Sequence, residues 1–288
     1  MDEKRIAGSA EGAGAARYGG RAETAVSTRG LTRRFGSFTA VDGVSLEVAR
    51  GEIFGFLGAN GAGKTTMIRM LCGLLMPSAG EATVAGFDVY RESESIKRNI
   101  GYMSQRFSLY EDLTIGENIE FYGGIYGLGM DEIRSRRDAL VGVLGLQAEA
   151  RKLTRDLPLG FKQRLALGTA LLHDPKIVFL DEPTSGVDPG VRRAFWDVIH
   201  EESKKGKTVF VSTHFMEEAE YCHRVSIMRD GRVIALGSPG ELKREYGRST
   251  IQEVFIEVAS GRPAAGGREA RPGGSGAADA AGKGDDRS

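Results

Sequence analysis

The fold of this chain is decided by one stretch of sequence, Gly58-Ala59-Asn60-Gly61-Ala62-Gly63-Lys64-Thr65-Thr66. An apolar run, residues 53–57, leads straight into it, and a helical pattern, residues 67–75, follows it. Strand, glycine-rich loop and helix in this order predict a phosphate-binding loop, because glycines let successive backbone N–H groups converge on phosphate oxygens. The N-terminus of the following helix adds partial positive charge. We therefore expect Lys64 to reach the β- and γ-phosphates of a nucleotide and the Thr65 hydroxyl to bind Mg²⁺.

A second apolar run, residues 177–180, ends in two acids, Asp181 and Glu182. A continuous apolar run of this kind is typical of a strand buried on both faces, so acids at its end differ from ordinary surface charge. Asp181 is placed to hold Mg²⁺ through water, and Glu182 is placed to polarise the water that attacks the γ-phosphate. Together the two motifs predict a site for nucleotide hydrolysis.

The composition is that of a globular protein without marked charge. Of the 288 residues, 41% are hydrophobic and 27% are charged, which is enough for a core of ordinary size. The 39 basic residues balance 39 acidic ones, so no nucleic-acid partner is expected. No apolar run approaches the roughly 20 residues that a membrane span needs. Cys72 and Cys222 are the only cysteines, and we expect two buried thiols in a reducing compartment.

Strand-like and helical patterns alternate along the middle of the chain. Residues 53–57, 177–180 and 209–211 are the clearest buried strands. The alternation predicts an α/β domain with a largely parallel sheet, which we place at residues 28–259. Residues 89–165 are more helical and interrupt the strand pattern. We expect them to form a helical subdomain inserted in the α/β core.

The two ends of the chain have a different composition. Residues 1–27 and 260–288 are dominated by Gly, Ala, Arg and acidic residues and contain almost nothing that could fill a core. Such segments cannot bury enough apolar surface to offset the entropy of folding. We expect both to be disordered tails.

Further motifs decide which kind of phosphate-loop ATPase this is. They are Phe35 in Thr32-Arg33-Arg34-Phe35-Gly36, Gln105 in Gly101-Tyr102-Met103-Ser104-Gln105, the segment Ser185-Gly186-Val187-Asp188, and His214 in Val211-Ser212-Thr213-His214. In order and spacing they resemble the nucleotide-binding domain of ABC transporters, over roughly residues 28–258. The resemblance implies a mainly parallel ATPase core, an antiparallel β subdomain and an inserted helical subdomain, with ATP and Mg²⁺ as cofactors.

The resemblance also implies a role for each of these residues. Phe35 would stack its ring on adenine, for which the π-face of an aromatic side chain suffices. Gln105 would sense Mg²⁺ and the attacking water, while its loop touches a membrane subunit. Asp188 would lie at the nucleotide in a loop that passes between the two ATPase domains of a dimer. His214 would contact the γ-phosphate from a strand beside the one that carries Glu182.

One motif departs from the family pattern. Where the family has the signature Leu-Ser-Gly-Gly-Gln, this chain has Leu157-Pro158-Leu159-Gly160-Phe161, so only Leu157 and Gly160 remain. In the family this segment holds the γ-phosphate of ATP bound to the opposite ATPase domain. Pro158 offers neither a hydroxyl nor an N–H. We therefore expect one of the two composite sites of a dimer to be weakened.

The variant signature and the segment 213–222 resemble the second ATPase half of tandem ATP-binding subunits in bacterial multidrug-type exporters. This closer resemblance implies an ATPase that sits peripherally on the cytoplasmic face of the cell membrane and drives export through a separate membrane permease. A second ATPase domain is an expected partner. The weakened signature favours a heterodimer over a homodimer.

Two other functions stay open. A soluble ABC ATPase acting on ribosomes or DNA is one, although DNA-repair members carry a long coiled coil where this chain has about 90 residues between loop and signature. Translation-factor members generally join two ATPase domains in one chain. A scaffold that no longer hydrolyses ATP is the other, motivated by Pro158. The intact set of Lys64, Asp181, Glu182 and His214 argues against it.

Overall fold

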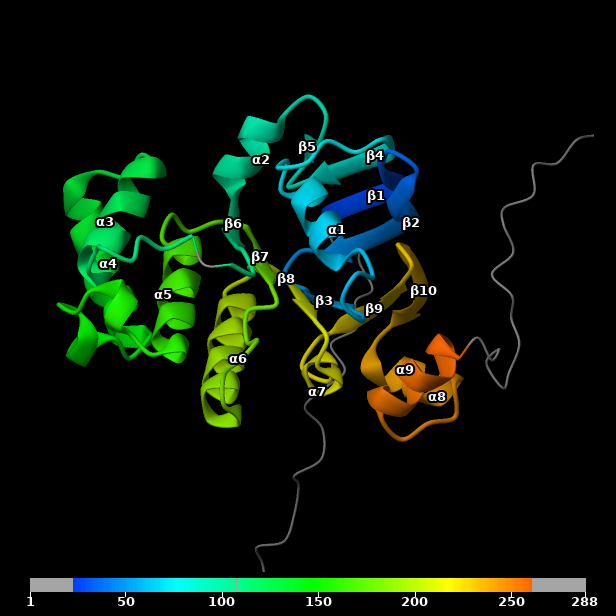
Figure 1. Ribbon diagram of the computed structural model, residues 1–288. Coiled ribbons are helices and arrows are strands. Elements are labelled where there is room, and N and C mark those ends of the chain that lie inside the picture. Colours follow the sequence, from blue (N-terminus) through cyan, green and yellow to red (C-terminus); the bar gives the residue numbers. More distant parts are fainter. Residues whose placement is uncertain (1–22, 107, 261–288) are drawn as a thin grey trace, which may run out of the picture.

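The computed structural model describes residues 23–106 and 108–260, which form two sheets with helices on their flanks (Figure 1). The strands are β1 (Thr24–Phe35), β2 (Phe38–Ala49), β3 (Ile53–Leu57), β4 (Ala79–Val84), β5 (Phe87–Asp88), β6 (Ile100–Met103), β7 (Ile177–Asp181), β8 (Thr208–Thr213), β9 (Arg224–Arg229) and β10 (Arg232–Gly237). The helices are α1 (Lys64–Leu71), α2 (Ser93–Asn99), α3 (Ile115–Ile125), α4 (Met130–Val143), α5 (Leu159–Leu171), α6 (Pro189–Lys204), α7 (Met216–Ala219), α8 (Pro239–Glu245) and α9 (Ile251–Ala259), with short 3₁₀ turns η1 (Gln147–Glu149) and η2 (Thr154–Asp156).

The larger sheet has six strands in the order β10-β9-β3-β8-β7-β6. All neighbours run parallel except β10, which pairs antiparallel with β9. β3 and β8 are buried along their whole length, as their continuous apolar sequences predict. The ring of Phe210 on β8 packs against Phe179 on β7 and Phe54 on β3, with centroids 4.7 and 5.7 Å apart. The largely parallel sheet and its three expected strands are confirmed.

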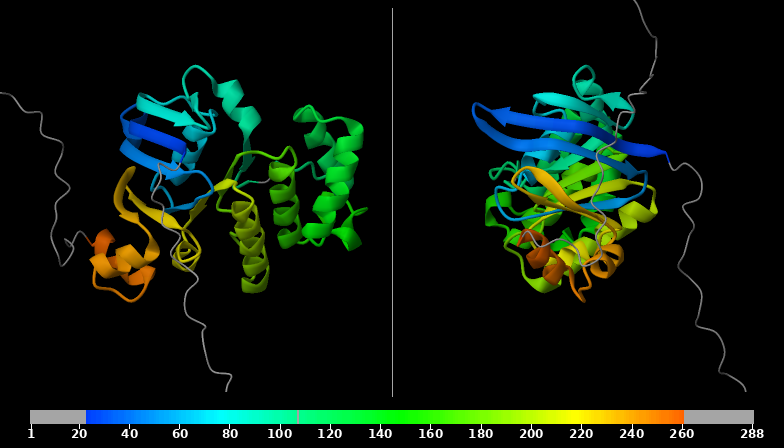
Figure 2. Two further views of the ribbon diagram at one scale, coloured as in Figure 1. Left: turned by 180° about the vertical axis from the view of Figure 1, so that it is seen from behind. Right: turned by 90° about the vertical axis from the view of Figure 1, so that its right-hand side faces the viewer.

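A smaller antiparallel sheet, in the order β2-β1-β4-β5, lies beside the larger one (Figures 1 and 2). α1 contacts β2 and β4 of the smaller sheet and β7 of the larger one. Val26 and Leu31 of the smaller sheet belong to the same buried cluster as Phe56 of β3 and Met67 of α1. The antiparallel subdomain therefore shares a core with the ATPase sheet and holds α1 between the two sheets.

The folded chain begins before the expected boundary at residue 28. Residues 24–27 belong to β1 and pair with β2 and β4, and Ala25 and Val26 are buried. Only a short apolar stretch marks this strand in a segment otherwise rich in glycine and charge, which is why the sequence pattern assigns it to the tail. The rest of the two expected tails, residues 1–22 and 261–288, lies outside the described residues.

The helical insertion also has a later start than expected. The sequence predicts it from residue 89, but β6 lies inside that range and runs parallel to β7 in the larger sheet. Beyond β6, α3 contacts both α4 and α5, and the three helices lie together on one flank of the sheet (Figure 1). β6 needs glycine at 101, because a Cβ there would lie 2.1 Å from the carbonyl oxygen of Ala170 on α5.

Within residues 23–106 and 108–260, no helix is long and apolar enough to cross a membrane. Cys72 and Cys222 are both buried and unpaired, as expected. Burial raises the pKa of each thiol, which makes both poor nucleophiles.

Candidate active site

The phosphate loop lies between the end of β3 and the start of α1, as predicted. Gly63 caps α1 with φ 104°, and a Cβ at this position would lie 2.5 Å from the carbonyl oxygen of Ala40. Only glycine therefore fits the turn that aims the first amides of α1 outward. The first turn of α1 contains no acidic residue, so its positive end is not neutralised by its own helix. Asn60 and Gly61 are exposed at the tip of the loop.

Lys64 is held over this loop and is only 4% exposed. Its Nζ donates to the carbonyl oxygens of Gly58 at 2.8 Å and Ala59 at 3.1 Å. The same Nζ lies 3.4 Å from Oε1 of Glu182. The cation of the loop and the acid at the end of β7 therefore form a buried ion pair.

Asp181 is joined to the loop by hydroxyl groups. Its Oδ1 accepts hydrogen bonds from Thr65 Oγ1 at 3.0 Å and from Ser212 Oγ at 2.6 Å. Its Oδ2 is buried and has no hydrogen-bond partner among the described residues. Burial raises the pKa of Asp181, and the two hydroxyl donors oppose that shift. A buried carboxylate oxygen without a partner, beside a threonine hydroxyl, is a donor set that fits Mg²⁺.

Glu182 brings three of the expected residues together. Its Oε2 accepts a hydrogen bond from Gln105 Nε2 at 3.1 Å and lies 3.2 Å from His214 Nδ1. With the contact from Lys64, one carboxylate meets side chains from α1, from the segment after β6 and from the end of β8. Glu182 itself has φ 49°, in the left-handed region that non-glycine residues seldom adopt. A cavity of about 630 Å³ opens beside it, lined in part by Thr65, Gln105 and Asp181.

Phe35 ends β1 and is 46% exposed. The guanidinium carbon of Arg33 lies 4.5 Å from the centroid of the Phe35 ring. A cation over the face of an aromatic ring attracts the ring, so Arg33 stabilises the position of the Phe35 side chain. The sequence interpretation missed Arg33, because an arginine two residues before an aromatic residue carries no signal until β1 is known to place both side chains on one face.

The signature segment is not part of this cluster. α5 lies apart from α1, with β6 and β7 between them (Figure 1). Pro158 is the N-cap of α5 and makes no side-chain cap hydrogen bond. Leu157 is buried, and Gly160 lies within α5, where a Cβ would be 3.0 Å from Val191 Cγ1 of α6. The single chain thus does not bring Leu157 and Gly160 to its own phosphate loop.

Asp188 also lies outside the cluster around Glu182, at the start of α6. Its Oδ1 accepts hydrogen bonds from the backbone N–H groups of Gly190 at 3.0 Å and Val191 at 3.1 Å, which makes it a helix N-cap. The side chain of Gln163 on α5 donates to the carbonyl oxygen of Ser185 at 2.9 Å. This bond connects the signature helix with the segment that leads to Asp188.

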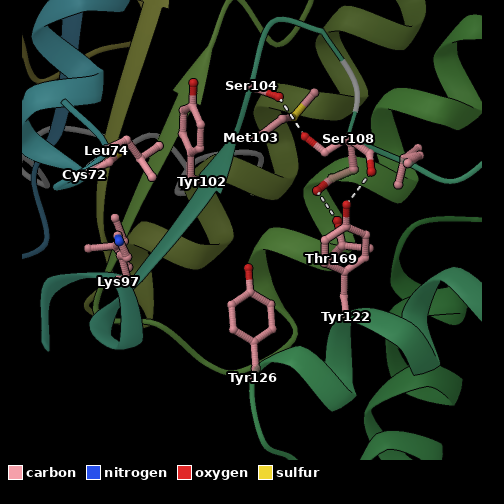
Figure 3. A pocket seen from close by; sticks show the side chains of 13 residues that line it. Cys72, Leu74, Lys97, Tyr102, Met103, Ser104, Ser108, Tyr122, Tyr126 and Thr169 are labelled. Carbon is pink, nitrogen blue, oxygen red and sulfur yellow. Dashed lines mark hydrogen bonds between the residues drawn. The ribbon is translucent and has the colours of Figure 1, made fainter. Parts of the chain in front are cut away.

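A second cavity, of about 250 Å³, lies between β6 and α3, next to the segment that carries Gln105 (Figure 3). Tyr122 and Tyr126 line it on one side, and Leu74, Lys97 and Tyr102 line it on the other. Burial raises the pKa of Tyr102 and of Tyr126 to about 12, so both phenols are neutral hydrogen-bonding groups. No sequence pattern indicates this cavity, because its walls come from segments far apart in the chain.

The sequence of this chain is similar to those of known proteins. Residues 41–185 match the family model described as ABC transporter. The chain is 47% identical, over 82% of its length, to the probable multidrug ABC transporter ATP-binding protein YbhF of Escherichia coli (strain K12), but spans only 42% of YbhF. It is 41% identical to the daunorubicin resistance ATP-binding protein DrrA3 of Streptomyces coeruleorubidus, covering 82% of this chain and 75% of DrrA3.

Solved structures of other proteins share the fold of this chain. An ATP-binding subunit of an ABC transporter superposes with a TM-score of 0.75 at 29% identity, covering 82% of this chain and all of the other. A dimeric ATP-binding cassette in a post-hydrolysis state with ADP and Pi superposes with a TM-score of 0.69 at 27% identity, covering 74% of this chain and 98% of the other.

Proposed function

Since the chain belongs to the family of ABC transporter ATP-binding proteins, we propose that it hydrolyses ATP with Mg²⁺ to drive export through a separate membrane permease. The observation that supports hydrolysis best is the Glu182 carboxylate, which Lys64, Gln105 and His214 contact at 3.4, 3.1 and 3.2 Å. A carboxylate at this position, next to a histidine and a glutamine that can orient water, can accept the proton of a water that attacks a phosphate bound at the loop.

Each group has a separate task in the proposed reaction. The loop amides and Lys64 bind the phosphates, and Phe35, backed by Arg33, stacks on adenine. Glu182 accepts a proton from the attacking water, while His214 and Gln105 orient that water and the γ-phosphate. Thr65, Asp181 and Gln105 would hold Mg²⁺, which supplies positive charge to the phosphate oxygens.

Export is supported by the relatives. The names of YbhF and DrrA3 refer to multidrug transport and daunorubicin resistance. We place the contact with the permease at the cavity beside the Gln105 segment, where Tyr122 and Tyr126 provide an aromatic wall (Figure 3). The chain would then lie peripherally on the cytoplasmic face of the membrane.

A heterodimer is favoured by the signature. In a dimer, Leu157, Gly160 and Asp188 of this chain would approach the nucleotide of the other ATPase domain. Pro158 can donate no hydrogen bond to that nucleotide. A partner with an intact signature would complete the site around Glu182, whereas the partner's own ATP would meet Pro158 and turn over slowly.

Resistance measurements test the export function. In a strain that lacks the chain, we expect the wild-type gene to restore resistance to at least one toxic compound, whereas Glu182→Gln should not, at equal protein level. A phenotype that Glu182→Gln restores as well would show that hydrolysis here does not drive export.

The asymmetry has its own test. Pro158→Ser, Leu159→Gly and Phe161→Gln together restore the family signature and should raise the ATPase activity of the isolated chain. The same three changes in a Glu182→Gln background serve as the control and should give no rise. Full, transport-coupled turnover by an unmodified homodimer would contradict the asymmetric arrangement.

A further inference from the structure

Glu218 is a fully buried acid that none of the roles above uses. It lies on α7, the short helix that follows His214 and Phe215, and its exposed fraction is 0%. The neighbouring acids Glu217 and Glu220 are exposed. A buried carboxylate is costly unless it is paired and hydrogen-bonded, so its surroundings decide what it does.

Two buried threonines satisfy this carboxylate. Thr213 Oγ1 donates to Glu218 Oε2 at 2.5 Å, and Thr184 Oγ1 donates to Glu218 Oε1. Thr213 and Thr184 are 2% and 1% exposed, so water cannot replace either bond. Thr213 Oγ1 also accepts a hydrogen bond from the Phe215 N–H at 3.0 Å. That bond closes the turn in which His214 sits.

The two threonines belong to the segments that carry the hydrolysis site. Thr213 immediately precedes His214, and Thr184 lies two residues after Glu182. One carboxylate therefore ties the segment after β7 to the end of β8. His214 Nδ1 lies 3.2 Å from Glu182 Oε2 across the two segments so joined.

A third contact extends the tie to α6. Arg192 Nε lies 3.5 Å from Glu218 Oε1, and its guanidinium carbon lies 4.0 Å from the centroid of the Phe215 ring. Arg192 therefore gives the buried carboxylate a countercharge and covers the residue after His214. Its helix is the one that Asp188 caps.

We infer that Glu218 is a positioning residue for ATP hydrolysis, which holds His214 in register with Glu182 by bonding Thr213 and Thr184. This inference rests on the proposed function, in which Glu182 and His214 act on the same water and phosphate. Lys64 does not contact Glu218, and the first residue of the phosphate loop, Gly58, reaches the tied segment only through its N–H, which donates to the carbonyl oxygen of Thr213 at 3.3 Å. Loss of Glu218 should therefore slow the hydrolysis step and leave ATP binding nearly unchanged.

Steady-state kinetics on the full chain, in complex with its membrane partner, test this. Glu218→Gln should lower kcat by about 10-fold or more, because small displacements of reacting groups are that costly, with KM for ATP within about twofold. Thr184→Val, a milder change, should lower kcat in the same direction, and Thr184→Ser should restore it. Glu220→Gln, a surface acid on the same turn paired with Lys243 at 2.8 Å, should change nothing.

A double variant separates positioning from general damage. In a His214→Ala background, Glu218→Gln should lower kcat by less than about twofold further, because the group it positions is gone. Equal losses in both backgrounds would overturn the inference, as would wild-type kcat in Glu218→Gln. A wild-type complex without ATPase activity would instead refute the proposed function.

Hydrogen exchange decides the matter without turnover. In Glu218→Gln we expect faster exchange in residues 183–187 and 212–216, but not in residues 59–66 of the phosphate loop, which lie beyond the bond from the Gly58 N–H to the Thr213 carbonyl oxygen. If exchange changed only in α7 itself, Glu218 would not be tying the two segments together.

Discussion

Glu182→Gln should separate ATP hydrolysis from ATP binding. The substitution keeps the size of the side chain and removes the carboxylate that accepts the proton of the attacking water. General-base contributions are typically about 10²–10⁴-fold in rate, which corresponds to roughly 3–5 kcal/mol of activation free energy. We therefore expect kcat to fall by at least about 100-fold.

The structure also sets the direction of the binding effect. Lys64 Nζ lies 3.4 Å from Glu182 Oε1, and at an effective dielectric constant near 20 that pair attracts by about 5 kcal/mol. Desolvation of the two buried ions offsets most of this attraction. If about 1 kcal/mol survives, ATP no longer has to compete for Lys64 in the variant and binds roughly fivefold more tightly.

Two measurements on the same preparations check this prediction. Phosphate release in the assembled complex gives kcat, and titration with a fluorescent ATP analogue gives affinity. Glu220→Gln is the matched control, because it makes the same chemical change on an exposed acid. Hydrolysis within threefold of wild type would remove Glu182 from the role of base. Binding more than threefold weaker would refute the competition for Lys64.

Other consequences of the site and the fold can be measured in the same way. Lys64→Ala should abolish or severely weaken binding of a fluorescent ATP analogue, because it removes the side-chain cation of the phosphate loop; wild-type affinity would contradict the loop assignment. Because burial raises the pKa of Asp181, its ionised form costs stability at pH values above that raised pKa. Asp181→Asn should therefore raise the melting temperature of the nucleotide-free chain at neutral pH, and the gain should shrink as the pH falls through the pKa; an equal gain at all pH values would point to another cause. A chain trimmed to residues 23–260 should keep its circular dichroism spectrum and its ATPase activity with the same partners, and loss of folding would show that a tail is structural.

The strands that the sequence predicts are those with one unambiguous signal. β3, β7 and β8 are continuous apolar runs because both of their faces are covered. β6 has four residues and follows directly on α2, so its apolar residues continue a helical pattern without a break. β1 is buried mainly through its pairing with β2 and β4, which depends on contacts that no local pattern records.

The candidate site also has residues that the sequence predicts and contacts that it does not. Lys64, Asp181 and Glu182 are found from the sequence because a phosphate loop and a buried strand that ends in two acids rarely occur together outside nucleotide-hydrolysing sites. Their mutual contacts could not be predicted, since the ion pair of Lys64 with Glu182 depends on the packing of β3 and β7 around β8. Glu218 carries no signal in the sequence. In Met216-Glu217-Glu218-Ala219-Glu220 three acids look alike, and only the fold shows that one of them faces inward.

The backbone of Glu182 has a consequence for directed evolution. A left-handed conformation costs a residue with a Cβ about 1–2 kcal/mol, and glycine or asparagine adopts it at less cost. Either substitution would also remove the carboxylate that pairs with the buried Lys64 ammonium, and losing one partner of a buried ion pair costs about 3–5 kcal/mol, more than the backbone would gain. A library selected only for heat resistance should therefore keep Glu at position 182, because the ion pair with Lys64 outweighs the cost of the left-handed backbone.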